Sequence, residues 1–511
     1  MDIIEELKKI NASQQAQIEE LIRQNQILTE QVKYLRNKLY GHSSEKSIDD
    51  GQTSPFDDAS NGVFEDPEST GEQIEIVTVR KKKRQSQKAK ITKNLLIKEE
   101  LIELAEHNCH NCGNAYQIFK RLIGDKFHLQ PAQAYIVRRY QEVGKCQHCS
   151  EDVNYDGDQF VSATVPQSFM AHSLASEDLV ATIIANKYEL ALPLYRQRQR
   201  LKGLGLSVSE ATLSNWVIFG SERVALVDQL LFRKLKQQPY LHGDETPIQV
   251  LREPGKSATS KSFLWEMRSA ANAATSIIHF HYDPSRSEKV ARAIYEGFNG
   301  TLVCDGYAGY NHIPPGIRRA GCWAHGRRKF VDGTNGIESQ RSLGRKFVKK
   351  FDQLFAIERK AQGFSPQQLL EIRQRESKPI VDSIWQLMSE TTPINKSKLG
   401  RAYTYMVNQR EQLEVFLNDP GVAISNNIAE RSIKTSVIGR KNWLFSTGQR
   451  GAKANALFLG LFETAIANHL DFKKYLVYLF TYLPRLGDSP TDEELEAYLP
   501  WAKAVQQSCA A

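Results

Sequence analysis

Three acidic residues from separated segments are the strongest candidates for chemistry in this chain. Asp244 and Asp305 each follow a run of strand-forming residues, and Glu430 lies at the start of a helix-like run. Carboxylate oxygens suit hard cations such as Mg²⁺ or Mn²⁺. Two such ions roughly 3.5–4 Å apart can activate an attacking oxygen and stabilise a leaving one. The three acids therefore predict a two-metal phosphoryl-transfer site.

Each acid also has a structural alternative. Asn427 and Glu430 have the spacing of a helix capping pair, and Glu430 with Lys434 has that of an i,i+4 ion pair. Glu245 competes with Asp244, because neighbouring residues of a strand point to opposite faces and only one of them should face the site. Side chains at the carboxyl ends of neighbouring strands do converge at the mouth of an open α/β sheet. The local pattern alone leaves these choices open.

Four of the seven cysteines form two Cys-x-x-Cys pairs, Cys109 with Cys112 and Cys146 with Cys149. Four thiolates are the ligand set of a closed, tetrahedral structural zinc site. The long gap between the pairs requires a β-hairpin to fold back between them. A degenerate or redox-active pair is the alternative, and three histidines could compete as ligands: His107, His110 and His148.

The other cysteines are predicted to bind no metal. Cys304 and Cys322 fall in strand-like runs and are expected in the core, whereas Cys509 is expected to be exposed in a C-terminal tail. No apolar run approaches the ~20 residues of a membrane span, and residues 1–6 lack the regions of a signal peptide. We therefore expect a cytoplasmic protein without a membrane segment, in a reducing compartment where paired cysteines favour metal over disulfide.

Basic and aromatic residues gather in two segments, 322–330 and 439–453. Lys and Arg bind phosphates by charge and hydrogen bonds, and exposed aromatic rings can stack on unpaired bases. The alternative places Trp323, Trp443 and Phe445 in the core, with the cations as a solvated rim. The residues predicted to contact DNA are Arg327, Lys329, Arg440, Lys441, Arg450 and Lys453.

The size and net charge of the chain are compatible with a DNA-binding protein but do not require one. At 511 residues the chain has room for roughly three or four domains. A net charge of +8 suits a polyanionic partner, although many globular proteins are as basic. Residues 49–75 are acidic and a basic run, 80–84, follows them. This change of sign indicates a solvated linker with a phosphate-seeking stretch, or a loop with no specific partner.

Residues 3–40 follow a heptad repeat. β-branched residues at one core position and Leu at the other favour a parallel two-stranded coiled coil, in which Asn11 and Asn25 would fix the register. The alternative is a single amphipathic helix packed on its own protein. The coiled coil predicts at least a homodimer.

The segments that must position the acids read as a mixed α/β sheet. Five strands are expected at 240–244, 263–268, 276–282, 300–305 and 318–323. A helix at 287–298 lies between the third and fourth, as in a crossover connection. Long helices at 337–418 interrupt this domain, and helices resume from Asn427 to about Pro484.

Residues 207–216 resemble the turn and second helix of a helix-turn-helix, with Ser209 as the cap. An ordinary surface helix is the alternative. The chain is thus predicted to be a multidomain α/β protein with these parts: a coiled coil at 1–46, a charged linker at 47–95, a zinc-binding module at 96–160, a helical DNA-binding region at 161–238, a catalytic domain at 239–484 with an insertion at about 337–418, and a tail at 485–511.

Several motifs, in order along almost the whole chain, resemble bacterial transposases of the insertion sequence 66 type, which are DDE enzymes. The motifs are the zipper ending at 35–46, both Cys-x-x-Cys pairs, and residues 192–197, 242–247, 305–307, 322–330, 425–431 and 439–445. The resemblance implies that Asp244, Asp305 and Glu430 are the catalytic triad. It selects Asp244 over Glu245 and sets aside the capping alternative for Glu430. It also implies a ribonuclease-H-like core with a helical insertion between the second Asp and the Glu.

The resemblance further implies what the chain acts on. A transposase would bind the element ends and target DNA, use Mg²⁺ or Mn²⁺, work with small accessory proteins of the same element, and be found at the bacterial nucleoid. Two alternatives stay open: a DNA-binding repressor with a non-catalytic core, and a metal-dependent nuclease without strand transfer. The presence of all three acids argues against the first, and the zipper, zinc module and motif order argue against the second.

Overall fold

The computed structural model describes most of the chain from residue 134 onward. The described residues are 14, 134–145, 160–163, 169–170, 173–334, 342–487 and 489–511. Three predicted features therefore lie outside the described residues: the coiled coil apart from the helical, exposed Gln14, the charged linker at 47–95, and the four cysteines predicted to bind zinc, Cys109, Cys112, Cys146 and Cys149.

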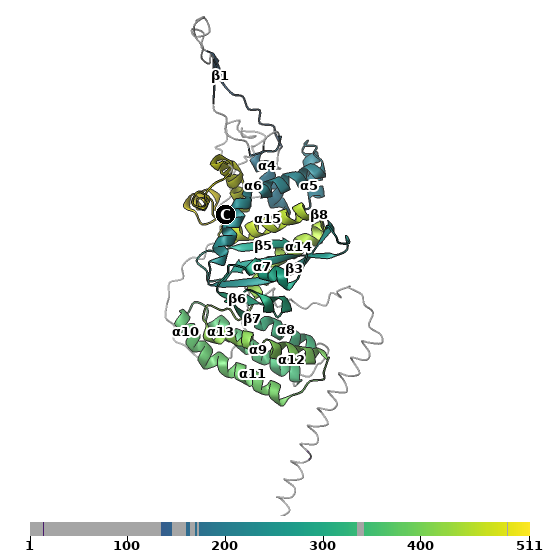
Figure 1. The fold of residues 1–511 in the computed structure, drawn as a ribbon, viewed down its shortest axis with the longest axis vertical. Helices are drawn as coiled ribbons and strands as arrows, with labels where there is room; N and C mark the ends of the chain where they lie inside the picture. The colour runs from purple at the N-terminus through teal and green to yellow at the C-terminus, as the bar shows by residue number, and fades with distance from the viewer. Residues whose placement is uncertain are drawn as a thin grey trace, which may run out of the picture. The chain divides into compact units, whose positions relative to one another are not determined.

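A mixed sheet forms the centre of the catalytic region (Figure 1). Its strands run in the order β5–β4–β3–β6–β7, and a short β8 pairs with the far end of β3. The first three strands along this path are antiparallel, whereas β3, β6 and β7 are parallel. Their bounds are β3 Tyr240–Arg252, β4 Lys261–Ser269, β5 Ile278–Asp283, β6 Thr301–Cys304, β7 Arg318–Gly321 and β8 Ser446–Gly448. The prediction of a mixed sheet from these five segments is confirmed.

Strand β3 is longer than the sequence suggested, and the prediction that it ends at Asp244 is wrong. The parallel partner β6 pairs with β3 only through its first three residues, ending at His242. The antiparallel partner β4 continues to pair with β3 as far as Gln249. Asp244 therefore lies in a part of β3 that pairs with β4 but no longer with β6.

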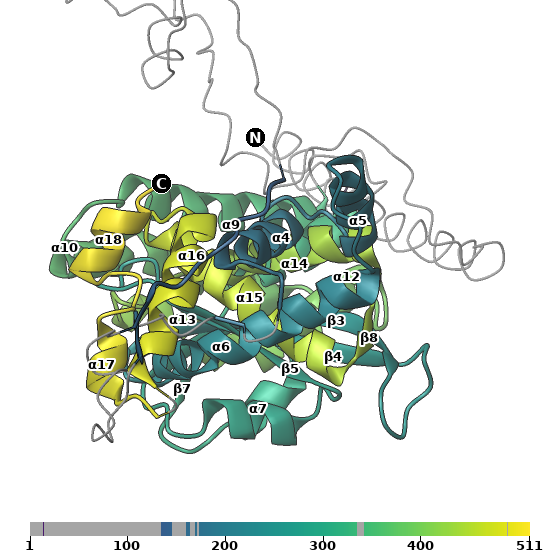
Figure 2. The same ribbon diagram turned by 90° about the horizontal axis from the view of Figure 1, so that it is seen from above.

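Helices cover both faces of the sheet (Figure 2). One face carries α7 and the short η2, and the side chain of Tyr295 from α7 lies so close to Gly243 that a Cβ there would meet its hydroxyl. The other face carries α14 and α15, with α4, α6 and α16 packed beyond them in the same hydrophobic core. The bounds are α4 Glu177–Tyr188, α5 Leu194–Gly203, α6 Glu210–Lys236, α7 Glu288–Tyr295, η2 Ala308–His312, α14 Asn427–Trp443, α15 Gln449–Ala467 and α16 Phe472–Tyr482.

A second core belongs to the helical insertion, which follows β7 and precedes α14. Buried aromatic rings fill it, and Val303 and Ala320 of the sheet join it at the β6–β7 edge. The indole of Trp323 donates to the carbonyl of Leu413 at 2.7 Å, which ties the two ends of the insertion together. Its elements are α8 Trp323–Thr334, α9 Leu343–Lys360, α10 Pro366–Ile372, η3 Arg373–Ser377, α11 Lys378–Glu390, α12 Lys398–Asn408 and α13 Arg410–Asn418. Helices α9–α13 occupy the segment predicted as helical at 337–418, and α8 precedes them from Trp323.

The segment predicted as a C-terminal tail packs back onto the core. After the turn η4 (Leu483–Leu486), it forms α17 (Asp492–Glu496) and α18 (Lys503–Cys509). Cys509 is 1% exposed, so its prediction as an exposed thiol is wrong. The reason is tertiary: the Cys509 carbonyl accepts from Asp471 and the next residue bridges to Leu470, which holds α18 against the start of α16.

The helical region before the sheet is confirmed in outline. Ser209 caps α6 by accepting from the amide of Thr212 at 3.0 Å, and the helix then runs to Lys236. Trp216 is buried and Asn215 is exposed. Upstream, β1 (Val143–Lys145) pairs with β2 (Phe160–Ser162), and the described residues 134–142 before β1 belong to no helix or strand. None of the described helices is both long and apolar enough to span a membrane.

Candidate active site

The first two acids lie side by side where strands β3 and β6 part. Their parallel register pairs Tyr240 with Thr301 and His242 with Val303. Extending this register by two residues places Asp244 opposite Asp305, which directly follows β6. Because residues in register on neighbouring strands point to the same face, this arrangement directs both carboxylates to the same side of the sheet.

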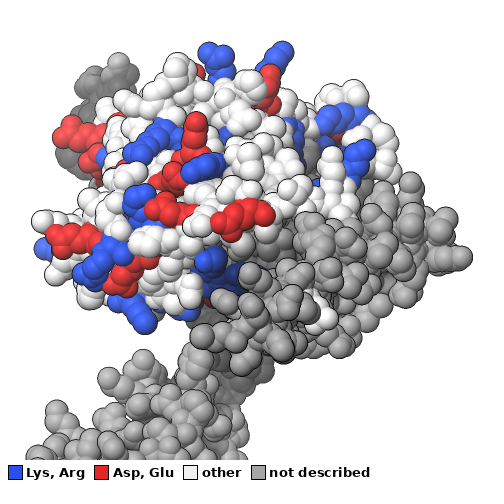
Figure 3. Space-filling view, turned by 90° about the horizontal axis from the view of Figure 1, so that it is seen from below, with Lys and Arg blue, Asp and Glu red and all other residues white. Residues whose placement is uncertain are grey.

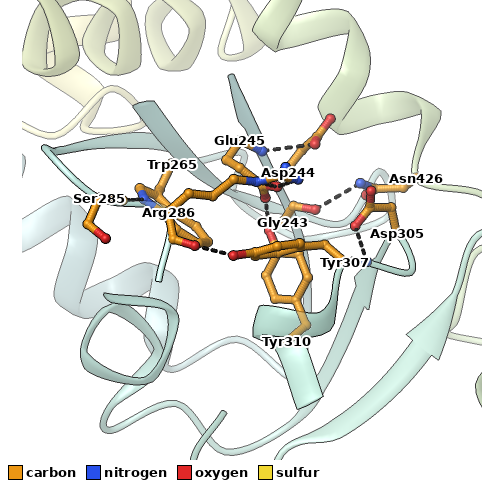
Figure 4. A network of polar contacts seen from close by, with 10 residues as sticks. All are labelled: Gly243, Asp244, Glu245, Trp265, Ser285, Arg286, Asp305, Tyr307, Tyr310 and Asn426. Atoms are coloured by element: carbon orange, nitrogen blue, oxygen red, sulfur yellow. Dashed lines mark hydrogen bonds and ion pairs between the residues drawn. The ribbon is translucent and has the colours of Figure 1, made fainter. Parts of the chain in front are cut away.

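Asp244 and Glu245 point to opposite faces, as strand alternation requires. Glu245 faces the α7 side, where one oxygen accepts from the Tyr310 hydroxyl at 2.6 Å and the other pairs with Arg286 (Figure 4). Asp244 accepts the backbone amide of Glu245 at 2.8 Å. Both oxygens of Glu245 are thus taken by structural partners, which leaves Asp244 as the acid on the α14 side.

The loop that carries Asp305 is anchored by aromatic residues. The Asp305 carboxylate accepts from the amide of Tyr307 at 2.9 Å, which fixes its orientation. The Tyr307 hydroxyl donates to the carbonyl of Arg286, and the Arg286 guanidinium lies 3.9 Å from the centre of the Tyr307 ring. Glu245, Arg286 and Tyr307 therefore form a connected network that holds the Asp305 loop against β3 and the segment after β5 (Figure 4).

Helix α14 is docked beside Asp244 by a buried amide. The residue that precedes the helix is Asn426, so the alternative in which Asn427 caps the helix does not hold. The Asn426 side chain makes no capping bond and instead contacts His242 Nδ1 at 2.9 Å and donates to the Gly243 carbonyl at 2.9 Å. Its own amide donates to Cys322 Sγ at 3.1 Å. Asn426 thus links β3, α8 and α14.

A second group of buried polar contacts holds the next turn of α14. Arg268 on β4 donates to the Ile428 carbonyl at 3.0 Å and to the Ser432 hydroxyl at 2.7 Å. The same hydroxyl donates to Glu266, the residue paired with Asp244 across the sheet. Burial raises the pKa of Glu266 well above its usual range. These contacts fix the rotation of α14, and with it the direction of Glu430.

Glu430 faces two side chains of α8. Its Oε2 accepts from Arg328 at 2.9 Å, and its Oε1 lies 3.6 Å from His325 Nδ1, which is too long for a hydrogen bond. The ion pair of Glu430 is therefore with Arg328 and not with Lys434. Sequence reasoning assigned no role to His325 or Arg328 individually. Their i,i+3 spacing on a helix that follows a strand is the signal that could have found them.

The electrostatics of the site reflect its concentration of acids. Burial raises the pKa of Asp244 well above its usual range, and the negative charges of Glu245, Asp305 and Glu430 add to the effect. Burial lowers the pKa of His325, against the opposing influence of Asp305 and Glu430. The site therefore favours added positive charge.

The three acids offer the type of donor atom that a hard divalent cation prefers, but their side chains are not arranged around a common point. Asp244, Asp305 and Glu430 offer only oxygen, the ligand type of Mg²⁺ and Mn²⁺. Glu430 Oε1 and Asn427 Oδ1 are buried with no hydrogen-bond partner among the described residues. Within that part of the chain, however, no three or more Asp, Glu, His or Cys side chains are arranged as a complete metal-binding group. The carboxylates repel one another, and Arg328 holds one oxygen of Glu430.

The six cations predicted to contact DNA differ in their surroundings. Arg327 pairs with Asp352 at 2.7 Å and Arg450 with Glu222 at 2.7 Å. The guanidinium of Arg440 donates to the Pro247 carbonyl and to Thr246 Oγ1 at 3.3 Å, which fastens the end of α14 to β3. Lys329 lies over the Tyr405 ring, at 4.8 Å, while Lys441 and Lys453 are exposed.

The aromatic residues of the same segments also differ. Trp323 is fully buried in the insertion core, as the core alternative predicts. Trp443 is half-buried and packs against the larger core. Leu444 and Phe445 are 60% and 42% exposed, and Leu444 has a positive φ of 66°. Among the large apolar side chains of segments 322–330 and 439–453, Leu444 and Phe445 are the exposed ones.

The strand order and the acids at the parting of β3 and β6 are consistent with a ribonuclease-H-like catalytic domain of the DDE class. Comparison with known families agrees. Residues 172–454 match the family described as Transposase IS66 family, and residues 27–99 match the one described as Transposase C of IS166 homeodomain. The chain belongs to the IS66 transposase family.

Similar proteins occur in Sinorhizobium fredii. Uncharacterized protein y4jD is 29% identical over 513 residues, which cover 95% of this chain and 96% of that protein. Uncharacterized protein y4qI is 31% identical over 360 residues, which cover 67% of this chain and 66% of that protein. The likeness to y4jD thus extends beyond the catalytic region to nearly the whole chain.

Replacing Asn426 with Ala should destabilise the protein by about 1–3 kcal/mol, because it leaves the buried His242 ring and Gly243 carbonyl without a partner. Chemical denaturation of the variant would measure this. Asn442→Ala is the matched control: the Asn442 amide makes only a 3.4 Å contact to the Ile438 carbonyl on the exposed part of α14. Equal losses in the two variants would contradict the assigned role of Asn426.

Replacing Asp244 with Asn should stabilise the metal-free protein near neutral pH. The pKa of Asp244 is higher in the folded protein than in the unfolded chain. Its contribution to stability is therefore fully present below the pKa of the unfolded chain and is lost as the pH rises through the pKa of the folded protein. With a chelator at about pH 8, the variant should melt roughly 2–4 °C higher, the shift expected for ~1 kcal/mol. The difference should shrink as the pH approaches about 4.

Asp382→Asn is the control for this measurement, because Asp382 is exposed and pairs with Lys378 at 3.2 Å. This change should give no gain at either pH. An Asp244→Asn variant that melts at or below the wild-type temperature at about pH 8 would show that the ionised carboxylate is not a source of strain.

Proposed function

We propose that this chain is an active DNA transposase that binds the ends of its element, hydrolyses a phosphodiester bond at each end, and joins the resulting 3′-hydroxyls to target DNA. The observation that carries the proposal is that Asp305 and Glu430 lie near enough to Asp244 for their charges to raise its pKa beyond the effect of burial. Asp244 and Asp305 follow the paired ends of β3 and β6, and Asn426 holds α14, which carries Glu430, against β3. Separated acids brought to one side of a ribonuclease-H-like sheet suit phosphoryl transfer.

Asp244, Asp305 and Glu430 would hold Mg²⁺ or Mn²⁺. When bound, such ions supply charge stabilisation at the phosphate and lower the pKa of an attacking oxygen. The unpartnered oxygen of Glu430 and the raised pKa of Asp244 support this role. Arg328 would have to share or release Glu430 on binding, because it now holds one of the carboxylate oxygens.

The reaction would proceed in two displacements at phosphorus. Water attacks the terminal phosphodiester and gives up a proton, the bond from phosphorus to the 3′-oxygen of the element breaks, and that oxygen takes up a proton to become a 3′-hydroxyl. The hydroxyl then attacks a target phosphodiester, forms a new bond to phosphorus and releases the target 3′-oxygen. Little covalent chemistry is asked of the protein, so positioning and charge dominate.

The residues around the triad suit this positioning role. The amides of Glu245 and Tyr307 fix the two aspartates. Arg328 lies on the exposed side of Glu430 and can donate to a phosphate oxygen as well as to the carboxylate. Lys329, Lys441 and Lys453 would contact the DNA backbone beside it, whereas Arg327, Arg440 and Arg450 already have protein partners.

The regions outside the catalytic domain would serve DNA binding and assembly. Cys109, Cys112, Cys146 and Cys149 would hold a structural Zn²⁺ in a module before the helices. The match of residues 27–99 to the second family model supports a distinct N-terminal module. Pairing of two chains through the heptad repeat would hold both element ends before they are cut. Small proteins encoded by the same element remain proposed partners.

Replacing Asp305 with Ala should abolish both hydrolysis and strand transfer but leave binding of element-end DNA largely intact. The reason is that Asp305 belongs to the triad and lies on a short anchored loop, not on a basic surface. The assay gives purified protein labelled element ends, a target plasmid and Mg²⁺. Asp382→Ala, which removes an exposed acid from α11, is the control and should join ends as the wild type does.

The outcomes of this assay separate the alternatives. Joined product from the Asp305→Ala variant would refute the triad. Cutting without joining by the wild type would favour a nuclease, and binding without cutting would favour a repressor or a missing accessory protein. Addition of the neighbouring gene products would distinguish those last two.

Replacing Leu21 and Leu28 with Gln should give monomers that cannot join paired ends, because both residues occupy the Leu position of the heptad. Light scattering would measure the solution mass. Arg23→Gln with Glu30→Gln, at positions of the repeat outside the seam, is the control and should leave the mass unchanged. An unchanged mass for the leucine variant would refute assembly through this segment.

A further inference from the structure

A basic hollow lies between α8 and α12, where the insertion meets the catalytic domain. Its volume is about 370 Å³, and it is lined by Lys329 and Asp332 of α8 and by Lys398, Arg401 and Ala402 of α12. Three cations therefore face one carboxylate. Lys398 and Arg401 are exposed and Lys329 is half-buried, so their charged groups are accessible from solvent.

These cations differ from their neighbours in making no ion pair with an acid in the part of the chain that the structure describes. Arg327, on the same helix, pairs with Asp352 at 2.7 Å, and Arg410 of α13 pairs with Glu414 at 3.1 Å. Within the described residues, no ion pair involves Lys329, Lys398 or Arg401. Like charges gathered without counter-charges destabilise the folded protein, and an anionic partner would relieve the repulsion.

The face of the insertion that lies away from the sheet is different. Figure 3 shows it with Lys and Arg interspersed among Asp and Glu. Ion pairs such as Lys378 with Asp382 account for part of this balance. The α8–α12 hollow, by contrast, is lined by three cations and one carboxylate.

The hollow adjoins the catalytic residues directly. The ammonium of Lys329 lies over the Tyr405 ring, and that ring packs so tightly on Gly306 that a Cβ there would lie 2.4 Å from it. Gly306 follows Asp305 in the chain. On α8, Arg328 contacts Glu430 and Lys329 is the next residue. At about 1.5 Å per residue, His325 and Lys329 are only ~6 Å apart along the helix axis.

We propose that the α8–α12 hollow binds the phosphodiester backbone of DNA next to the scissile phosphate, with Lys329, Lys398 and Arg401 on its phosphate oxygens. The inference rests on the proposed function and extends it, because it makes the helical insertion part of the DNA interface. Successive phosphates of one strand rise about 3.4 Å along the duplex. The hollow therefore corresponds to backbone within a few nucleotides of the reacting bond.

The test compares DNA binding by Lys398→Gln/Arg401→Gln with binding by Arg359→Gln/Lys360→Gln. Both variants remove two exposed cations from the insertion, but Arg359 and Lys360 end α9 next to α10, at the opposite end of the helical layer from α12 (Figures 1 and 2). Fluorescence anisotropy would follow a labelled element-end duplex at several salt concentrations. Each phosphate contact contributes roughly 0.9 to the slope of log affinity against log salt.

The α12 variant should bind roughly tenfold or more weakly at low salt and show a slope smaller by about 1–2. The α9 variant should match the wild type. Exchanging the cations, as Lys398→Arg/Arg401→Lys, should restore the slope, since phosphate contacts require charge and not one side chain. A random duplex of the same length should show the same differences, because backbone contacts carry no sequence information.

Duplexes shortened stepwise from each side of the cleavage site would locate the contact. The difference between the wild type and the α12 variant should vanish once the bound backbone is removed, within a few nucleotides of that site. Equal affinity and slope for both would overturn this inference while leaving the proposed function intact, provided that the wild type still joins ends. A wild type that neither binds nor joins element ends would overturn the proposed function itself.

Discussion

The docking of α14 on the sheet is the contact on which the rest of the site depends. A helix held only by apolar side chains can rotate or slide at small cost, but this one is held by buried polar groups that are satisfied in a single arrangement. Asn426 spans from the helix start to β3, and Arg268 reaches the helix from β4. Because Glu430 lies between these two attachments, its direction follows from them. The helix end is fastened in the same way by Arg440.

The sheet contributes a second constraint, the separation of β3 from β6. While two parallel strands are paired, their backbone groups bond to each other and their side chains fill the space above. After His242 the strands part, and this opening is where Asp244 and Asp305 lie. Burial, and then the charges of the neighbouring acids, raise the pKa of Asp244, and the surrounding core must outweigh this cost of ionisation. Burial and the charge of Asp305 also raise the pKa of Glu245, while the hydrogen bond from Tyr310 and the charge of Arg286 oppose that rise.

The helical insertion joins this centre at two points and has a core of its own. Trp323 anchors its beginning and end through the carbonyl of Leu413, while Tyr405 packs on the glycine next to Asp305. Membership in the IS66 transposase family gives these contacts a functional setting. The insertion thus packs against the loop that carries Asp305, and the proposed DNA contact would place substrate beside that packing.

The sequence by itself indicated the kind of most elements and, through its family resemblance, which three acids to propose for the site. Periodicity and capping residues act over a few neighbours, so the five strands, the Ser209 cap and the helical insertion could all be predicted. Motif order indicated the family, and the alternation of β3 separated Asp244 from Glu245 once a face was known. Tertiary structure decided which strands pair, which helices pack together and which side chains meet. Strand β3 continues past Asp244 because β4 pairs with it, Asn426 turns to His242 because that ring is nearby, and Cys509 is buried because α18 packs against α16. Glu430 meets Arg328 across a hundred residues of sequence. Such contacts depend on distances in space between segments far apart in the chain, and no local window of sequence contains them.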